Sequence, residues 1–369
     1  MPEFSVADHR FMARALQLAE RGRYSTHPNP RVGCVIVAAG EIAAEGWHET
    51  AGGPHAEAMA LAAAGEAARG ATAYVSLEPC SHHGRTPPCT DALAHAGIVR
   101  VVFAAADPNA KVDGAAVLAE RGIDVSGGLL ADAARRLNEG FFSRLQKHRP
   151  FVRVKVAASL DGATAMEDGS SQWISGPSAR ADVQRLRAES SAVLTGIGTV
   201  LADDPSLNVR DTALDTRGRQ PLRVVIDSRL RMPAGSRMLS LDGDTLVYCV
   251  DDANRATLEQ AGATVVRVEA GSERPQLEAV LADLAAREIN EVLVEAGAML
   301  GGAFLQSGLV DELVLYQAPV LLGSRTKGLF ATPDWRALSD KLALKVVDIR
   351  QFGPDTRIIA RPDAASAAS

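Results

Sequence analysis

The chain has 369 residues, which suggests two or three domains, and its 47% hydrophobic and 23% charged content is typical of a globular protein. A net charge of −6 without a basic patch argues against a nucleic-acid partner, and the lack of any run of 18 apolar residues argues against a membrane span. Four cysteines without a disulfide framework fit a cytoplasmic protein.

Residues 1–146 alternate between helical and extended patterns. Periodic apolar residues predict a helix over 5–22, with Asp8 placed to cap it. The two prolines around Asn29 predict an extended loop, and a buried strand follows at 34–38. Further strands are expected at 42–46, 72–77, 100–105 and 123–126, and helices at 56–68, 90–96, 117–121 and 132–143. This order predicts a mixed sheet with helices on both faces.

His55, Cys80 and Cys89 form a metal-binding pattern in this first half. One imidazole and two thiolates suit zinc, and three protein ligands leave a fourth position for water, as in a catalytic site. Glu57 follows His55 closely enough to move protons beside the metal without binding it. The pattern is the signature of zinc deaminases, except that eight residues rather than two separate the cysteines.

A closed structural zinc site is the alternative, with His82 or His83 as fourth ligand. Such sites usually contain paired Cys-x-x-Cys knuckles, which this sequence lacks, and Glu57 would then have no task. Two other polar residues have equally open interpretations. Asn29 could direct its amide toward a pyrimidine or simply form a turn, and His48 could contact substrate or simply end a strand.

The segments Pro54-His55-Ala56-Glu57 and Leu-Glu-Pro-Cys-Ser-His-His-Gly-Arg-Thr-Pro-Pro-Cys, residues 77–89, resemble the bacterial bifunctional deaminase/reductases of riboflavin biosynthesis. The long insert between the cysteines is the form found in that family. The resemblance implies a cytidine-deaminase-like domain in which Glu57 is catalytic and His55, Cys80 and Cys89 bind Zn²⁺. It further implies a set of deaminase substrate contacts: Asn29, His48, His82, Arg85, Asp107 and Asn109.

The polar segment 146–150 is the predicted domain boundary, giving one domain at 1–147, a second at 148–363 and a disordered tail at 364–369. The strand expected at 151–158 should point its valines inward and Arg153 and Lys155 outward. The α/β alternation continues, and the last strands, within 313–320 and 342–361, should lie antiparallel at the edge of a parallel core.

Three local signals occur in this second half. Ser175 and Pro177 predict the start of a helix that runs to about residue 187. Gly196-x-Gly198 lacks the third glycine of a dinucleotide fingerprint, so we reject that interpretation. The glycine-rich turn at 297–302 favours phosphate binding at a helix start, although close packing of that helix on the sheet is the alternative.

Several segments of the second half also resemble the reductase domain of the same family. They are residues 154–162, 171–174, 199–210 and 294–297. The resemblance implies a fold similar to dihydrofolate reductase and an NADPH cofactor. The implied substrate contacts are Ser171, Arg187, Leu207, Arg210 and Glu295, with salt bridging as the alternative for Arg187. The implied cofactor contacts are Ala157, Trp173, Thr199, Asp203, Ser228, Gly297, Ala298, Met299, Leu300, Gly301, Gly302 and Ala303.

The activity implied by the resemblance has two steps. The amino-terminal domain would hydrolyse the 2-amino group of 2,5-diamino-6-(5-phosphoribosylamino)pyrimidin-4(3H)-one, and the carboxyl-terminal domain would then reduce the ribosyl chain with NADPH. A homo-oligomer, dimer or tetramer, is expected. The alternatives are a nucleic-acid base deaminase, which the acidic charge and the few aromatic residues disfavour, and a zinc-stabilised binding module without turnover, which Glu57 disfavours.

Overall fold

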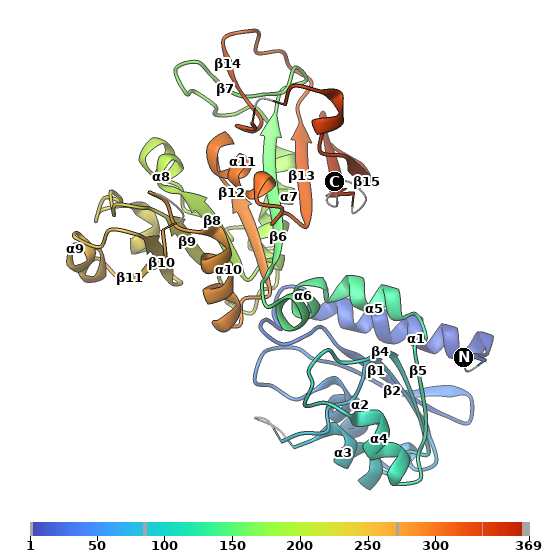
Figure 1. Ribbon diagram of the computed structural model, residues 1–369. Coiled ribbons are helices and arrows are strands. Elements are labelled where there is room, and N and C mark those ends of the chain that lie inside the picture. Colours follow the sequence, from blue (N-terminus) through green and yellow to red (C-terminus); the bar gives the residue numbers. More distant parts are fainter. Residues whose placement is uncertain (1–2, 84–86, 271–272, 334, 364–369) are drawn as a thin grey trace. The chain divides into compact units, whose positions relative to one another are not determined.

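The computed structural model describes residues 3–83, 87–270, 273–333 and 335–363. The chain divides into two units, Met1–His148 and Arg149–Ser369, and the division falls within the polar segment expected to separate domains (Figure 1). The tail at 364–369 lies outside the described residues, so its expected disorder stays a prediction. In the described parts of the chain, every helix is too short or too polar to cross a bilayer.

The amino-terminal unit is built on a five-stranded mixed sheet in the order β2-β1-β3-β4-β5. β1 (Gly33–Ala38) pairs antiparallel with β2 (Glu41–Trp47) and with β3 (Thr72–Leu77). β3, β4 (Arg100–Ala105) and β5 (Asp124–Gly127) run parallel. The carboxyl ends of β3 and β4 therefore lie side by side, and the loops that leave them start from one edge of the sheet.

Helices cover both faces of this sheet, as the sequence predicts. One apolar cluster packs α1, α5 and α6 against the sheet, and the other packs α2, α3 and α4 against the opposite face. Their bounds are α1 Val6–Ala19, α2 Ala56–Ala64, α3 Cys89–His95, α4 Gly114–Glu120, α5 Ala131–Leu137 and α6 Glu139–Lys147. Gly46 lets α2 approach β2 closely, because a Cβ there would lie 2.4 Å from the carbonyl oxygen of Ala56.

The capping of α1 corrects one sequence prediction. Ser5, not Asp8, is the N-cap residue, and the two side chains form a reciprocal capping box. Asp8 also accepts hydrogen bonds from the Tyr74 hydroxyl at 2.6 Å and from Arg100 Nη1 at 2.8 Å. This buried carboxylate therefore joins the start of α1 to β3 and β4.

The carboxyl-terminal unit contains a nine-stranded sheet in the order β11-β10-β9-β8-β12-β6-β13-β16-β15. The first seven of these strands run parallel to their neighbours, and β16 and β15 add antiparallel at one edge, as predicted for residues 342–361. The strand within 313–320 was expected among the antiparallel edge strands, but β13 pairs parallel with β6 and belongs to the parallel core. The bounds are β6 Phe151–Ala158, β8 Ala192–Gly196, β9 Leu222–Ile226, β10 Thr245–Cys249, β11 Ala263–Arg267, β12 Glu291–Glu295, β13 Glu312–Gln317, β15 Leu344–Phe352 and β16 Asp355–Pro362. A separate two-stranded sheet of β7 (Ala163–Met166) and β14 (Thr326–Gly328) was not predicted.

Both faces of the large sheet are also covered by helices. α10 (Leu277–Ala286) and α11 (Ala298–Gln306) pack on one face, and α7 (Pro177–Glu189), α8 (Ile197–Asp203) and α9 (Arg255–Gln260) pack on the other. The N-cap of α7 is the residue after the predicted Ser175, Gly176, which places Pro177 at the first helical position.

The outward orientation expected for Arg153 and Lys155 is wrong. Their face of β6 is the α7 face, where both side chains are only partly exposed. Arg153 is largely buried and its Nε donates to Glu312 Oε1 at 2.7 Å. An alternating strand usually has one exposed face, but a strand central to a doubly covered sheet does not.

Candidate active sites

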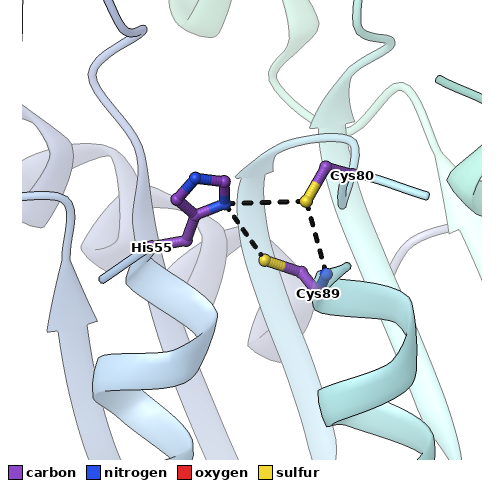
Figure 2. A group of neighbouring side chains, drawn as sticks. All are labelled: His55, Cys80 and Cys89. Carbon is purple, nitrogen blue, oxygen red and sulfur yellow. Dashed lines mark hydrogen bonds between the residues drawn. The ribbon is translucent and has the colours of Figure 1, made fainter. Parts of the chain in front are cut away.

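Three side chains from different segments of the amino-terminal unit meet at one point (Figure 2). His55 is the N-cap of α2, Cys89 is the first residue of α3, and Cys80 lies in the loop after β3. His55 Nδ1 lies 3.2 Å from Cys89 Sγ and 3.6 Å from Cys80 Sγ, and all three ligand atoms lie within 4.8 Å of one another. The structure thus brings together the three metal ligands expected from the sequence.

This donor set fits zinc. Tetrahedral nitrogen and sulfur ligands at their usual zinc distances lie about 3.5 to 3.8 Å apart, which is close to the separations found here. Hydrogen bonding from Cys89 and from His55 holds the pKa of the Cys80 thiol well below its usual value, so this sulfur is ready to bind as a thiolate. Among the described residues, neither His82 nor His83 joins the cluster as a fourth ligand. An open three-ligand site is therefore favoured over a closed structural one.

Glu57 lies in the first turn of α2 beside these ligands and is buried. Burial, together with the nearby Cys80, raises the pKa of its carboxyl. A carboxyl with a raised pKa exchanges protons more readily near neutral pH than an exposed one. Its position and environment fit the proton-transfer role expected from the sequence.

Asn29 and His48 are linked by a hydrogen-bond chain that sets their orientation. His48 Nδ1 lies 2.9 Å from the carbonyl oxygen of Pro54, so this nitrogen is the donor. Nε2 then accepts from Asn29 Nδ2 at 3.0 Å, and burial lowers the pKa of His48, which favours this neutral form. The arrangement leaves the amide oxygen of Asn29 as its free acceptor. The His48 ring contacts the His55 ring edge-on at 5.6 Å between centroids, next to the metal ligands.

The other expected deaminase contacts lie on two loops. Asp107 and Asn109 follow β4, and Asn109 N–H donates to Asp107 Oδ1 at 2.8 Å. Burial raises the pKa of Asp107 to about 6, and the charge of Glu78 acts in the same direction. His82 lies on the other of the two loops, after β3. Arg85 lies outside the described residues, so its role stays a prediction.

A cluster of charged side chains forms in the carboxyl-terminal unit. Arg187 of α7 makes a two-pronged ion pair with Glu295 at the end of β12, with Nε and Nη2 at 2.6 and 2.9 Å from the carboxylate oxygens. Salt bridging, the alternative left open for Arg187, is therefore present. Arg210 is exposed near this pair and holds Asn208 Oδ1 at 3.2 Å.

Lys155 is a member of this cluster that sequence reasoning missed. It is the register partner of Glu295 on the neighbouring strand β6, and both side chains belong to the α7 face. Burial lowers the pKa of Lys155, against the opposing effect of Glu295. The signal available in the sequence was a lysine within a strand of a parallel α/β pattern, where both faces of the sheet are covered. Of the other expected substrate contacts, Ser171 is half-buried before α7 and Leu207 is buried after α8.

The expected cofactor contacts follow parallel strands that are neighbours in the sheet. Gly297 is the N-cap of α11, and Leu300 approaches Gly196, where a Cβ would lie 3.2 Å from Leu300 Cδ2. The turns after β8 and β12 therefore lie together, with Thr199 and Asp203 on α8, Ser228 after β9 and Ala157 near the end of β6. The exposed Trp173 joins this region through its neighbour Gln172, whose Nε2 donates to Asp203 Oδ1 at 3.3 Å.

Known proteins share this combination of units. Residues 150–358 match the RibD C-terminal domain, and residues 5–105 match the cytidine and deoxycytidylate deaminase zinc-binding region. The riboflavin biosynthesis protein RibD of Escherichia coli K12 is 50% identical over 361 residues, which cover 95% of this chain and 98% of that protein. The chain belongs to the RibD family.

Solved structures of family members agree with this assignment. Acinetobacter baumannii RibD superposes with a TM-score of 0.91 at 44% identity, covering 97% of this chain and 99% of that one. A Thermotoga maritima diaminohydroxyphosphoribosylaminopyrimidine deaminase/5-amino-6-(5-phosphoribosylamino)uracil reductase has a TM-score of 0.85 at 34% identity with the same coverage. As a RibD protein, the chain is a bifunctional deaminase and reductase of riboflavin biosynthesis that uses zinc and NADPH.

Replacing either cysteine ligand should abolish zinc binding. We expect about one zinc per chain in the purified protein and little in Cys80→Ser or Cys89→Ser, because two ligands hold zinc weakly. Metal content is measured by elemental analysis, and ammonia release should fall with it. Cys249→Ala, a buried cysteine of the other unit, is the matched control and should keep its zinc. Full zinc occupancy in both serine variants would contradict the assignment.

Proposed function

We propose that each unit carries one of the two activities. The amino-terminal unit deaminates 2,5-diamino-6-(5-phosphoribosylamino)pyrimidin-4(3H)-one to 5-amino-6-(5-phosphoribosylamino)uracil, and the carboxyl-terminal unit reduces that product to 5-amino-6-(5-phosphoribitylamino)uracil. The observation that carries the proposal is the three-ligand cluster beside the buried Glu57 in one unit. The charged cluster around Lys155 and Glu295 in the other unit supports the second step.

In the deaminase unit the residues bind the ring and move protons. The His-Cys-Cys cluster would hold the zinc, which when bound would lower the pKa of a water molecule. Asn29 offers its amide oxygen, fixed by His48, to the polar edge of the pyrimidine. Glu57 accepts a proton from the water and delivers one to the departing 2-amino group. One water is consumed and one ammonia is released, so the carboxyl of Glu57 returns to its starting state.

Glu57→Gln should separate proton transfer from metal binding. Glutamine has nearly the same size but cannot carry a proton, so ammonia release should fall by about two to four orders of magnitude while zinc stays bound. Reduction of the already deaminated substrate should continue unchanged, because Glu57 belongs to the other unit. Loss of reduction in a folded, zinc-loaded Glu57→Gln protein would contradict the division of activities between the units.

In the reductase unit the residues hold a phosphorylated, polar substrate against the cofactor. NADPH, when bound, supplies the hydride. Glu295 is held by Arg187 and faces the ribosyl hydroxyls, while the exposed Arg210 is free to bind the 5-phosphate through charge-assisted hydrogen bonds. Lys155 donates the proton that the ring oxygen requires when the ribosyl ring opens.

Arg210→Ala should weaken substrate binding. The KM for the deaminated substrate should rise about ten- to a hundredfold, the usual effect of losing a hydrogen bond to a charged group, while the KM for NADPH changes little. Arg267→Ala is the control, since Arg267 is exposed on the edge strand β11. A larger effect on the KM for NADPH would reassign Arg210 to the cofactor.

Lys155→Met should impair the reductase through kcat. Methionine keeps the length of the side chain without a proton to give, so kcat should fall by about two orders of magnitude or more. Because burial lowers the pKa of Lys155, it loses its proton at a lower pH than an exposed lysine does. Wild-type kcat should therefore fall as the pH rises through that lowered pKa, and Lys155→Met should lack this limb. The same alkaline limb in both proteins would contradict the role.

We also propose that the protein is a homo-oligomer assembled through β15. This strand is one edge of the nine-stranded sheet, and it exposes Leu344, Val346, Val347 and Ile349. An exposed apolar edge strand needs a cover, and an antiparallel copy of itself around a two-fold axis supplies one.

The absence of disulfides among the four cysteines supports a reducing, cytoplasmic setting, which cell fractionation would test.

Charges on this strand should separate the subunits. Val347→Asp combined with Ile349→Asp should convert the native oligomer to a smaller species by sedimentation, because two copies would bury like charges against each other. Lys345→Ser on the same strand is the control and should keep the native mass. An unchanged mass in the double variant would place the interface elsewhere.

A further inference from the structure

Two loops of the amino-terminal unit leave the same edge of the sheet. The first, residues 78–88, connects β3 to α3 and contains the zinc ligand Cys80. The second, residues 106–113, connects β4 to α4 and contains Asp107 and Asn109. β3 and β4 are parallel neighbours with Leu77 opposite Ala105, and Glu78 N–H extends this pairing by donating to the Ala105 carbonyl at 2.9 Å. Beyond this point only side chains and close packing can hold the two loops together.

The Glu78 carboxylate bridges the two loops with both of its oxygens. Oε2 accepts from the backbone N–H of Asp107 at 3.3 Å, and Oε1 accepts from the backbone N–H of Ala115 at 3.0 Å. The Asp107 amide lies at the start of the second loop, and the Ala115 amide lies just after the loop, in the first turn of α4. Asp113, at the N-cap position of α4, makes no side-chain capping bond of its own. Glu78 therefore satisfies a free amide at the start of α4 from a different element.

Two more contacts, from residues that follow Glu78 in the first loop, reinforce this connection. Ser81 Oγ accepts from the backbone N–H of Asp113 at 2.9 Å. Gly114 packs so closely on the first loop that a Cβ there would lie 2.0 Å from the Pro79 carbonyl oxygen. Glu78, Pro79 and Ser81 of the first loop thus hold the second loop and the start of α4. Cys80, which lies between Pro79 and Ser81, is a zinc ligand. A shift of the second loop relative to the zinc ligands would break all of these contacts together.

Placing a carboxylate in this bridge is energetically unfavourable. Glu78 is half-buried, and its charge contributes to the raised pKa of the neighbouring Asp107. A hydroxyl or amide could brace one amide without that repulsion, but neither offers two equivalent acceptor oxygens. Both acceptor oxygens of Glu78 are used, one by an amide of the second loop and one by an amide just after it. Glu78 therefore fixes the position of the loop that carries Asp107 and Asn109.

We propose that Glu78 is a positioning residue of the deaminase, holding the substrate-binding loop 106–113 at a fixed place relative to the zinc ligands. The proposal rests on the proposed deaminase function and on the expectation, implied by the family resemblance, that Asp107 and Asn109 contact the pyrimidine substrate. Glu78 itself touches neither the metal ligands' donor atoms nor the reacting groups in this scheme. Its loss should therefore weaken substrate binding without removing zinc or proton transfer.

Glu78→Gln in the full-length, zinc-loaded protein tests this directly. Glutamine keeps one acceptor oxygen but replaces the other with a donor, so one loop amide loses its partner. The KM for the diaminopyrimidine substrate should rise about ten- to a hundredfold, with zinc content unchanged and kcat within about threefold. Glu120→Gln, at the exposed end of α4, is the matched control and should behave like the wild type. Loss of zinc, or a fall in kcat alone, would overturn the proposal.

A double-mutant cycle with Asp107→Asn separates positioning from a merely structural role. If Glu78 acts through the loop that carries Asp107, the Glu78→Gln/Asp107→Asn protein should have nearly the KM of Asp107→Asn alone. Fully additive effects would overturn the proposal. A normal KM in Asp107→Asn would instead refute the substrate contact that the family resemblance implies for Asp107. Should Glu78→Gln fail to fold, Glu78→Asp carries the test, because its shorter carboxylate cannot reach both amides and must also raise KM.

Discussion

The arrangement of both sites depends on parallel pairing between neighbouring strands. Parallel strands end at the same edge of a sheet, so the loops that follow them converge without any further device. β3 and β4 bring the Cys80 loop and the Asp107 loop together, and β6, β8, β9 and β12 do the same for the segments expected to hold the cofactor. Side-chain contacts then adjust the positions of loops that strand pairing has already brought close together.

Packing on the helix side completes the zinc site. His55 and Cys89 stand at the starts of α2 and α3, so their positions are set by how closely those helices rest on the sheet. The glycine at position 46 permits the approach of α2, since any Cβ there would collide with the helix backbone. The zinc ligands are thus placed by strand pairing on one side and by helix–sheet contact on the other, and Figure 2 shows the result as three side chains converging from separate elements.

Features that depend on local sequence could be predicted, whereas features that depend on tertiary contacts could not. The order of strands and helices follows from apolar periodicity, and the His-x-Glu and Cys spacing identifies the zinc ligands because the chemistry demands those residue types. The orientation of Lys155 was wrong because alternation alone cannot tell a half-covered strand from one covered on both faces. The part played by Glu78 was also missed, because its partners are backbone amides about thirty residues away, which leave no side-chain pattern to read. The N-cap residues were misassigned by three positions at Ser5 and by one at Gly176, because several polar residues competed for each cap.

Burial shifts the pKa values of the two residues proposed to transfer protons in opposite directions, by one physical rule. Removing water disfavours whichever form of a group is charged, so it raises the pKa of a carboxyl and lowers that of an amine. Glu57 gains affinity for a proton in this way, and Lys155 loses it. Each shift moves the pKa of the group toward neutral pH. A group whose pKa lies near the working pH can both take up and release a proton at useful rates. Neighbouring charges also change the size of each pKa shift. Cys80 adds to the effect of burial at Glu57, whereas Glu295 opposes the effect of burial at Lys155. A hydrolytic deamination and a hydride reduction can therefore both be proposed to use partly desolvated ionisable groups, one in the first turn of α2 and the other within β6.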